Sequence, residues 1–272
     1  MKIRSMLFLW MLACASAVFH SCKKDKDEEE TITINAKWEI TDAGSKYVSF
    51  EFNKDGNYIV VEESSAKSAS ALKDAAGVAG GTTGVPFIAS PQRAAMKPSA
   101  SNQPVTRFGS YTMRDEQTLV LSGFGVLRII AMTEKELSFS LTLEGQTKAM
   151  QFNAVKAKNT VSASTQTDRL CRTWNLVTLI GLPIAADSES AITMLISRAG
   201  TYFCEYGYGA SSLSQWKWYD YPGAEKETVI AYSHDNWNTM GVGIINTLTD
   251  DTLILTDAVG FVYEFALIND TE

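Results

Sequence analysis

Histidine is almost absent from this sequence: 272 residues contain only two, His20 and His234. The chain therefore has almost none of the histidines that a catalytic triad with a histidine base, or a metal site with several histidine ligands, would need. The sequence also has no Gly-x-Ser-x-Gly turn, no Walker-type phosphate loop and no Cys-x-x-Cys pair. We expect no catalytic residue, no metal and no cofactor, so the protein is predicted not to be an enzyme.

Positive charge is also scarce. The chain has 24 lysine and arginine residues against 31 acidic ones, a formal net charge of −7, and it has no basic stripe. Domains that bind nucleic acid use such a stripe to neutralise phosphates, so we expect no nucleic-acid partner. Removing residues 1–21 would take away two basic residues and no acidic one, which would change the charge to −9.

A long hydrophobic run is missing as well. The apolar run at residues 6–18 is shorter than the ~20 residues that a membrane-spanning helix requires. Lys2 and Arg4 precede this run, and a basic segment followed by a short apolar one is typical of a secretory signal peptide. The sequence therefore predicts a signal peptide at residues 1–21.

A cysteine follows the predicted signal peptide. Ser21 is the small residue that lipoprotein signal peptidase requires before a lipidated cysteine, here Cys22. The segment is similar to the lipobox of Gram-negative lipoproteins, although Phe19 and His20 depart from the usual leucine and small residue. Acyl chains on Cys22 would anchor the chain in a membrane. Cys14 is the alternative site, but it would leave a very short apolar run.

Charged residues follow Cys22. The segment KKDKDEEE cannot bury apolar surface, so residues 22–31 are predicted to form an acylated, acidic tether. This segment is either a spacer alone, or one of the acidic signals that send lipoproteins of some gut anaerobes to the outer cell face. The predicted location is the outer membrane, with both its periplasmic and its extracellular face left open.

Only two cysteines, Cys171 and Cys204, remain beyond the predicted lipidation site. An exported protein reaches a compartment that permits disulfides. A bond between the two would contribute roughly 3 kcal/mol in the chain-entropy model. Two buried free thiols are the alternative, because free cysteine behaves as a small apolar residue.

The two halves of the chain repeat each other. Three pairs of segments carry the repeat: AKWEIT (36–41) and RTWNLV (172–177), NKDGNYIVVE (53–62) and SRAGTYFCEY (197–206), IIAMTEKELSF (129–139) and IINTLTDDTLIL (244–255). Each half also divides into eight short alternating runs between turn signals, which is the signature of β-strands. The predicted strands are 33–41, 46–53, 56–63, 107–113, 117–122, 125–132, 135–143 and 146–155, then 170–180, 191–197, 200–206, 213–221, 227–232, 242–248, 251–257 and 260–268.

Eight antiparallel strands in sequence can close into a barrel, which removes the exposed sheet edges. At this level the chain resembles the lipocalin-like domains of secreted bacterial lipoproteins, a family whose function is poorly defined. The resemblance rests on Trp38 and Trp174, on the Gly-x-Tyr steps Gly56/Tyr58 and Gly200/Tyr202, and on Leu137 and Leu253. It implies an all-β protein with two tandem eight-stranded antiparallel up-and-down barrels.

Two segments do not fit the strand pattern. Residues 64–106 hold four of the six prolines, and 28 of these 43 residues are Ala, Ser, Gly, Pro or Thr, so we expect a disordered insertion. Residues 157–168 are expected to form a linker. The predicted domains are therefore 32–156, interrupted by the insertion, and 169–272.

Aromatic residues are concentrated in the second half: ten of the 28 lie between Tyr202 and Trp237. One interpretation is that Trp216, Trp218, Tyr202 and Tyr206 fill the barrel, since eight strands leave just enough room for side chains. The other is that some form a binding surface for a glycan or a small apolar molecule. The candidate ligand-binding residues are Tyr206, Tyr208, Trp216, Trp218, Tyr219, Tyr221 and Trp237, of which Tyr208, Tyr219, Tyr221 and Trp237 are expected to be exposed.

These patterns favour a non-catalytic lipoprotein that binds a ligand through the second domain. The alternative is a structural protein with filled barrels that docks a partner protein in the envelope. Catalysis has little support, because His234 beside Asp235 is typical of a solvated turn. The acidic pair Asp250 and Asp251 is explained by hairpin geometry, because the matching turn of the first half carries Glu134 and Lys135. A hydrolase would need two carboxylates about 5–9 Å apart in one cleft.

Overall fold

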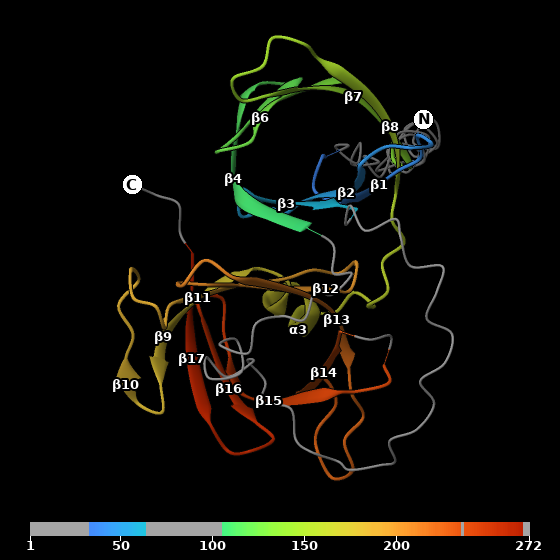
Figure 1. Cartoon of the computed structure of the whole chain (residues 1–272). Coiled ribbons are helices and arrows are strands. Elements are labelled where there is room, and N and C mark those ends of the chain that lie inside the picture. Colours follow the sequence, from blue (N-terminus) through green and yellow to red (C-terminus); the bar gives the residue numbers. More distant parts are fainter. Residues whose placement is uncertain (1–32, 64–104, 235–236, 269–272) are drawn as a thin grey trace, which may run out of the picture. The chain divides into compact units, whose positions relative to one another are not determined.

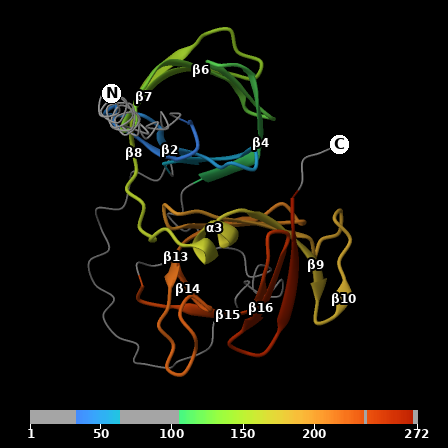
Figure 2. The same ribbon diagram turned by 180° about the vertical axis from the view of Figure 1, so that it is seen from behind.

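Two closed antiparallel β-barrels make up nearly all of the fold (Figures 1 and 2). The computed structural model describes residues 33–63, 105–234 and 237–268. The predicted signal peptide, the lipidation site Cys22, the tether and nearly all of the predicted insertion lie outside the described residues. The predicted all-β fold with two eight-stranded up-and-down barrels is confirmed.

The first barrel follows the order of the sequence. Each strand pairs with the next, and β1 pairs with β8 to close the ring. Period-2 burial accounts for the pattern: in β7, ELSFSLTL, the leucines and Phe139 point into the core and the residues between them do not. The strands are β1 (Lys37–Ile40), β2 (Tyr47–Phe52), β3 (Asn57–Glu62), β4 (Val105–Asp115), β5 (Thr118–Leu121), β6 (Gly125–Met132), β7 (Glu136–Leu143) and β8 (Met150–Lys156).

The second barrel repeats this topology with two additions. The short helix α3 (Thr165–Leu170) precedes it, so the predicted linker ends in a helix that Ser164 caps by accepting a bond from the Thr167 amide. The two-residue strand β10 (Leu182–Pro183) extends β9 as a hairpin. The barrel strands are β9 (Thr173–Leu179), β11 (Ile192–Ile196), β12 (Thr201–Tyr206), β13 (Ser211–Trp218), β14 (Val229–Ser233), β15 (Gly241–Leu248), β16 (Thr252–Asp257) and β17 (Val262–Leu267), with β9 paired to β17.

The sequence repeat corresponds to repeated hydrogen bonds. The indole N–H of Trp38 donates to the Ile34 carbonyl at 2.8 Å, and that of Trp174 donates to the Leu170 carbonyl at 3.0 Å, four residues earlier in both cases. Both indoles are buried. The tryptophan at the start of each repeat therefore fixes the entry of the chain into its barrel.

The Gly-x-Tyr hairpins also match. Gly56 and Gly200 have φ of +81° and +85°, a left-handed conformation that glycine adopts without strain. Their carbonyls accept equivalent bonds from the next strand but one, Gly56 from the Tyr111 amide and Gly200 from the Trp216 amide. These turns therefore set the register of the second, third and fourth strands of each barrel.

Each barrel has a core of its own. The first core contains Trp38, Phe50, Phe139 and other residues of β1–β8, and the second contains Trp174, Trp216 and other residues of α3 and β9–β17. A third, smaller cluster consists of outward-facing residues from both barrels: Ile59, Val61, Leu195 and Phe203, with Phe108 and Leu213 against them. The two halves thus do not share one continuous core.

This third cluster explains why two strands are buried on both faces. In β3 (NYIVVE) and β12 (TYFCEY) almost every residue is buried, because one face points into its barrel and the other meets residues of the third cluster. Polar bonds accompany the contact: Thr201 Oγ1 donates to Glu51 Oε2 at 2.7 Å, and Asn53 Nδ2 donates to Thr173 Oγ1 at 2.6 Å. Residues 34–272 accordingly form one unit.

Candidate functional site

The interior of the second barrel is packed with aromatic side chains. Trp216 is 1% exposed and Tyr206 is 7% exposed, so two of the predicted ligand-binding residues lie in the core instead of on a surface. Tyr202 and Tyr232 stack there with ring centroids 5.2 Å apart. Of the four side chains expected to fill the barrel, Trp216, Tyr202 and Tyr206 are buried in the core, and Trp218 packs against it partly buried.

The phenol groups in this core are held as neutral hydrogen-bonding groups. Tyr263 Oη donates to Asp257 Oδ2 at 3.1 Å, and Tyr206 Oη lies 3.3 Å from Ser212 Oγ. Burial raises the pKa of Tyr263, and the nearby Asp257 raises it further. Burial likewise raises the pKa of Tyr202 and that of Tyr206. Phenols with raised pKa values do not serve as bases near neutral pH.

Both cysteines of the second barrel, Cys171 and Cys204, are free thiols. The disulfide, one of the two alternatives that the sequence leaves open, is therefore not formed. Cys204 is buried in the core, and Cys171 packs against the same core. Burial raises the pKa of Cys204 to about 12 and raises that of Cys171 too. Both stay protonated near neutral pH and lack the thiolate that a reactive cysteine needs.

A groove of about 690 Å³ lies outside the barrels, on the outer face of β13. Its lining includes Leu213, Gln215 and Lys217 of this strand and also Ser214 and Trp216, the buried residues between them. The hairpin at residues 199–201 and the end of β14 also line it. The remaining lining residues are Lys37, Glu39, Ala157, Lys158, Thr160, Ser233, His234 and Trp237. This volume would accommodate a small ligand.

Two predicted site residues line this groove: Trp216, whose side chain is buried in the core, and Trp237. The φ of Trp237 is +73°, a left-handed conformation that is uncommon and strained for a residue with a side chain. The backbone amide of Trp237 donates to Ser233 Oγ at 2.9 Å, and Lys217 Nζ lies 4.1 Å from the indole ring centroid. The half-buried indole is therefore held in place next to a positive charge.

His234 and Ser214 lie together in the same groove. Ser214 Oγ is 2.6 Å from His234 Nδ1, but Ser214 is only 6% exposed. Asp235, the residue that follows His234 in the sequence, lies outside the described residues. Within the described ranges no carboxylate bonds to the imidazole, so the orienting acid of a catalytic triad is not in place there. Among the described lining residues Glu39 is the one carboxylate, so the groove offers no acid pair.

The other predicted site residues lie elsewhere. Trp218 contacts Trp216 edge-to-face at 5.5 Å, and its indole donates to Thr167 Oγ1 at 2.9 Å. Tyr208 stacks on Tyr206 with centroids 5.4 Å apart. Strand β13 ends at Trp218, before the end of the predicted strand 213–221, so Tyr219 and Tyr221 follow it in a loop with their ring centroids 6.2 Å apart. The structure therefore does not bring the seven predicted residues into one site.

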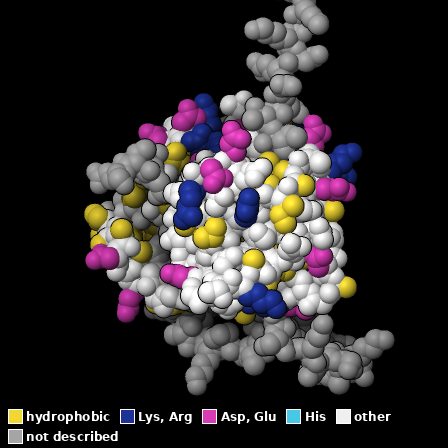
Figure 3. Space-filling model, turned by 90° about the horizontal axis from the view of Figure 1, so that it is seen from above, with side chains coloured by type: hydrophobic (Ala, Val, Ile, Leu, Met, Phe, Trp, Pro, Cys, Tyr) yellow, Lys and Arg dark blue, Asp and Glu magenta, His cyan; other side chains and the backbone are white. Residues whose placement is uncertain are grey.

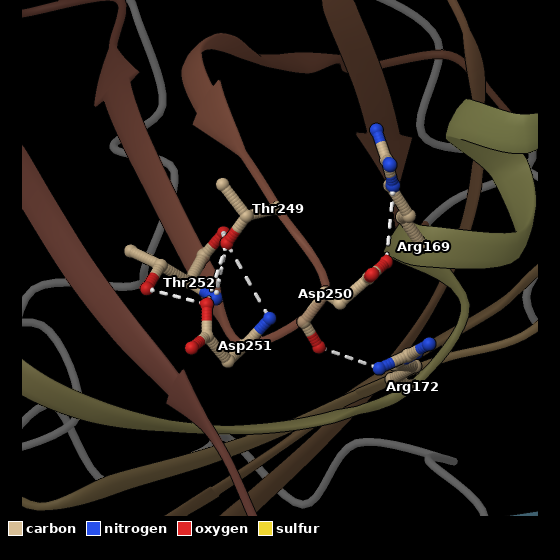
Figure 4. Close-up of polar contacts among 6 residues, drawn as sticks. All are labelled: Arg169, Arg172, Thr249, Asp250, Asp251 and Thr252. Atoms are coloured by element: carbon tan, nitrogen blue, oxygen red, sulfur yellow. Dashed lines mark hydrogen bonds and ion pairs between the residues drawn. The ribbon is translucent and has the colours of Figure 1, made fainter.

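The acidic turn of the second half is structural (Figure 4). Thr249 Oγ1 accepts from the Asp251 and Thr252 amides and donates to Asp251 Oδ1 at 2.7 Å. Asp250 instead points toward the helix, where Arg169 Nε donates to its carboxylate at 3.1 Å. In the first barrel Thr133 Oγ1 accepts from the Lys135 and Glu136 amides in the same way.

The described lining of the groove carries more positive than negative side chains. Figure 3 shows acidic and basic side chains interspersed over the face seen from above the view of Figure 1. In the groove the described charged residues are three lysines and one glutamate. The described lining of the groove therefore has a net positive charge.

Comparisons with protein-family models and with curated proteins found no match for this chain. The lipocalin-like family resemblance therefore stays a prediction. Within the described ranges there is no cluster of three or more His, Cys, Asp or Glu residues suited to a metal ion. The helices described there include none long and apolar enough to cross a bilayer.

Proposed function

We propose that this protein is a non-catalytic binding protein of the cell envelope, and that a glycan binds in the groove beside Trp237. The observation that carries the proposal is the strained, half-buried Trp237 at the edge of a groove of about 690 Å³. Strained residues of this kind are found where the side chain is needed in one place. An aromatic ring is a surface on which a sugar ring can stack.

The polarity of the lining favours a glycan over a small apolar molecule. Leu213 and Trp237 supply apolar surface, while Gln215, Lys217 and His234 supply hydrogen-bonding groups. Sugars need both kinds of contact at once. A small apolar ligand of a β-barrel would normally occupy the interior, and here the interior holds Trp216 and the other core side chains.

Attachment to a membrane is part of the proposal. Cys22 is the proposed lipidation site, the acidic tether connects it to the first barrel, and the outer membrane is the proposed location. The signal-peptide pattern and Ser21 support this location. Metabolic labelling with a radioactive fatty acid would test it, since Cys22→Ala should abolish the label and Cys14→Ala should not.

Ligand titration tests the binding function. The purified mature chain is titrated with a panel of neutral and acidic oligosaccharides while tryptophan fluorescence is recorded. A bound sugar should change the emission of Trp237, and Trp237→Ala should weaken binding ~10-fold or more, as expected for an aromatic anchor. Tyr221→Ala is the matched control, because Tyr221 is exposed and lies outside the groove. Equal loss in both variants would contradict the assignment of the groove.

A second candidate function is docking of an envelope protein. Two hairpin tips of the second barrel expose large apolar side chains, and the Ile180 amide donates to the Val262 carbonyl at 2.8 Å to join them. The exposed side chains there are Ile180, Leu182, Val259, Phe261 and Val262. Surface patches of this kind mark contact sites. In-cell cross-linking tests it: the Leu182→Ser/Phe261→Ser variant should lose a cross-linked species that the wild type and Trp237→Ala both keep.

A further inference from the structure

We infer that the ligand of the groove is an acidic saccharide, one that carries carboxylate or sulfate groups. This inference rests on the proposed function, because it specifies which glycans the groove selects. Its basis is the charge of the groove and the position of Lys217 against Trp237.

The groove is positive on an acidic protein. Lys37, Lys158 and Lys217 line it together with one acidic residue, Glu39, whereas the whole chain has a formal charge of −7. Lys37 and Glu39 come from β1, Lys158 from the segment after β8, and Lys217 from β13. Three cations from separate parts of the chain therefore meet in one groove, where they attract anions and repel cations.

Among the described residues, no ion pair involves these three lysines. The ion pairs found in the described part of the chain use Lys46, Arg107, Arg169 and Arg198 as their cations. None of these four lines the groove. Lys158 and Lys217 are exposed, and Lys37 is partly exposed. An ammonium group donates up to three hydrogen bonds, so a bound anion would give these groups charge-assisted partners.

Lys217 links the charge to the aromatic surface. Its Nζ lies 4.1 Å from the centroid of the Trp237 ring. A sugar that packs beside this ring therefore has its substituents within reach of a positive charge. A neutral sugar would displace water from the ammonium group and offer it only a hydroxyl acceptor. A uronate or a sulfated sugar would add the attraction between opposite charges.

Matched ligands test the inference. The purified mature chain is titrated by calorimetry with an oligogalacturonate of one length, with its methyl-esterified form, and with a sulfated oligosaccharide of similar length. The ester keeps the sugar backbone and removes the charge. At low salt we expect the acid to bind more tightly than the ester, by ~10-fold or more. The affinity of the acid should fall as the salt concentration rises, because salt screens exposed charges. The sulfated arm shows whether carboxylate or sulfate is preferred.

Variants locate the effect in the groove. Lys158→Gln and Lys217→Gln should each weaken binding of the preferred acid by ~3–10-fold and leave binding of the ester little changed. Lys156→Gln is the matched control, since Lys156 is exposed two residues away and does not line the groove. Equal affinity for acid and ester would overturn this inference and leave the proposed glycan site standing. Binding of neither, with no change in fluorescence, would overturn both.

Discussion

The two barrels share their turns and their buried entry tryptophans, but they are filled differently. Phenylalanine dominates the first core, with Phe50, Phe52, Phe124, Phe139 and Phe152. Tyrosine dominates the second, with Tyr202, Tyr206, Tyr232 and Tyr263. The pairing register makes the exchange specific: Phe152 lies opposite Phe139 in the first barrel, and Tyr263 lies opposite Leu255 at the matching place in the second.

A second exchange accompanies the first. Leu141 occupies β7 two positions after Phe139, and Asp257 occupies β16 two positions after Leu255. Both are buried, but Asp257 accepts bonds from Tyr263 Oη and from the amides of Val259 and Phe261. The apolar core needs only packing, whereas the polar core needs each partner in place. The same topology thus holds with two kinds of interior, and the second should respond more strongly to polar changes.

The largest effect should come from the entry tryptophans, where the two barrels are alike. Trp38→Ala and Trp174→Ala should each lower the free energy of unfolding by about 3–5 kcal/mol, because a large buried ring is lost and a carbonyl loses its donor. Urea unfolding followed by circular dichroism measures this. Trp237→Ala, outside both cores, is the control. Similar losses for Trp38 and Trp174 would support the equivalence, and a loss at one of them alone would break it.

The next effect concerns the place where the barrels differ. Asp257→Leu gives the second barrel the leucine that the first barrel has at Leu141. It should lower the free energy of unfolding by about 2–3 kcal/mol, because Tyr263 Oη loses the Asp257 carboxylate as its acceptor. Adding Tyr263→Phe should recover about 1 kcal/mol, because the hydroxyl that donates to Asp257 is then removed as well. Urea unfolding of the two single variants and the double variant gives the coupling. Additive losses would show that the Asp257–Tyr263 bond does not organise this core.

Alkaline pH should separate the barrels further. Burial raises the pKa of Tyr202 and that of Tyr232 in the second core. In the first core, burial raises the pKa of Tyr58 to about 12. A tyrosine with a raised pKa in the folded state keeps its proton when the unfolded chain has lost it. Stability is therefore unchanged below the unfolded pKa of about 10 and falls above it, by about 1.4 kcal/mol per pH unit for each such group.

Denaturant midpoints measured between pH 8 and pH 11 check this sign. We expect a decline that starts near pH 10, and the Tyr232→Phe variant should decline less steeply. Tyr221→Phe serves as the control, because Tyr221 is exposed. A midpoint that stays constant to pH 11 would contradict the neutral-phenol description of the second core.

The fold could be predicted from the sequence because its signals are local. Strict alternation, as in ELSFSLTL, and turns such as KDGN fix strands and hairpins within a few residues of each other. Helix α3 was missed because six residues are too few for a helical period to show. Strand β10 was missed because two residues have no alternation.

The site was harder to predict. The aromatic density pointed to the region that contains Trp237, but composition does not tell which face of a strand is covered. Both interpretations, barrel filling and ligand binding, therefore apply to Trp216 and Tyr206 on composition, and the structure places both side chains in the core. Lys37 and Lys158 carried no signal, because they reach the groove only after β1 and β8 pair and the chain leaves the first barrel.

The smallest effect concerns the β9–β10 hairpin, which the first barrel lacks. Ile180 has φ of +53° and Gly181 has φ of +73°, so an exposed β-branched residue occupies a left-handed position of a two-residue turn. Asn-Gly is the pair such turns prefer. Ile180→Asn should therefore stabilise the protein by about 0.5–1 kcal/mol in urea unfolding, while Leu182→Asn, which relieves no strain, should not. A loss of stability in Ile180→Asn would instead show that the isoleucine side chain packs against Val262, and would favour the hairpin tips as a structural element over a docking surface.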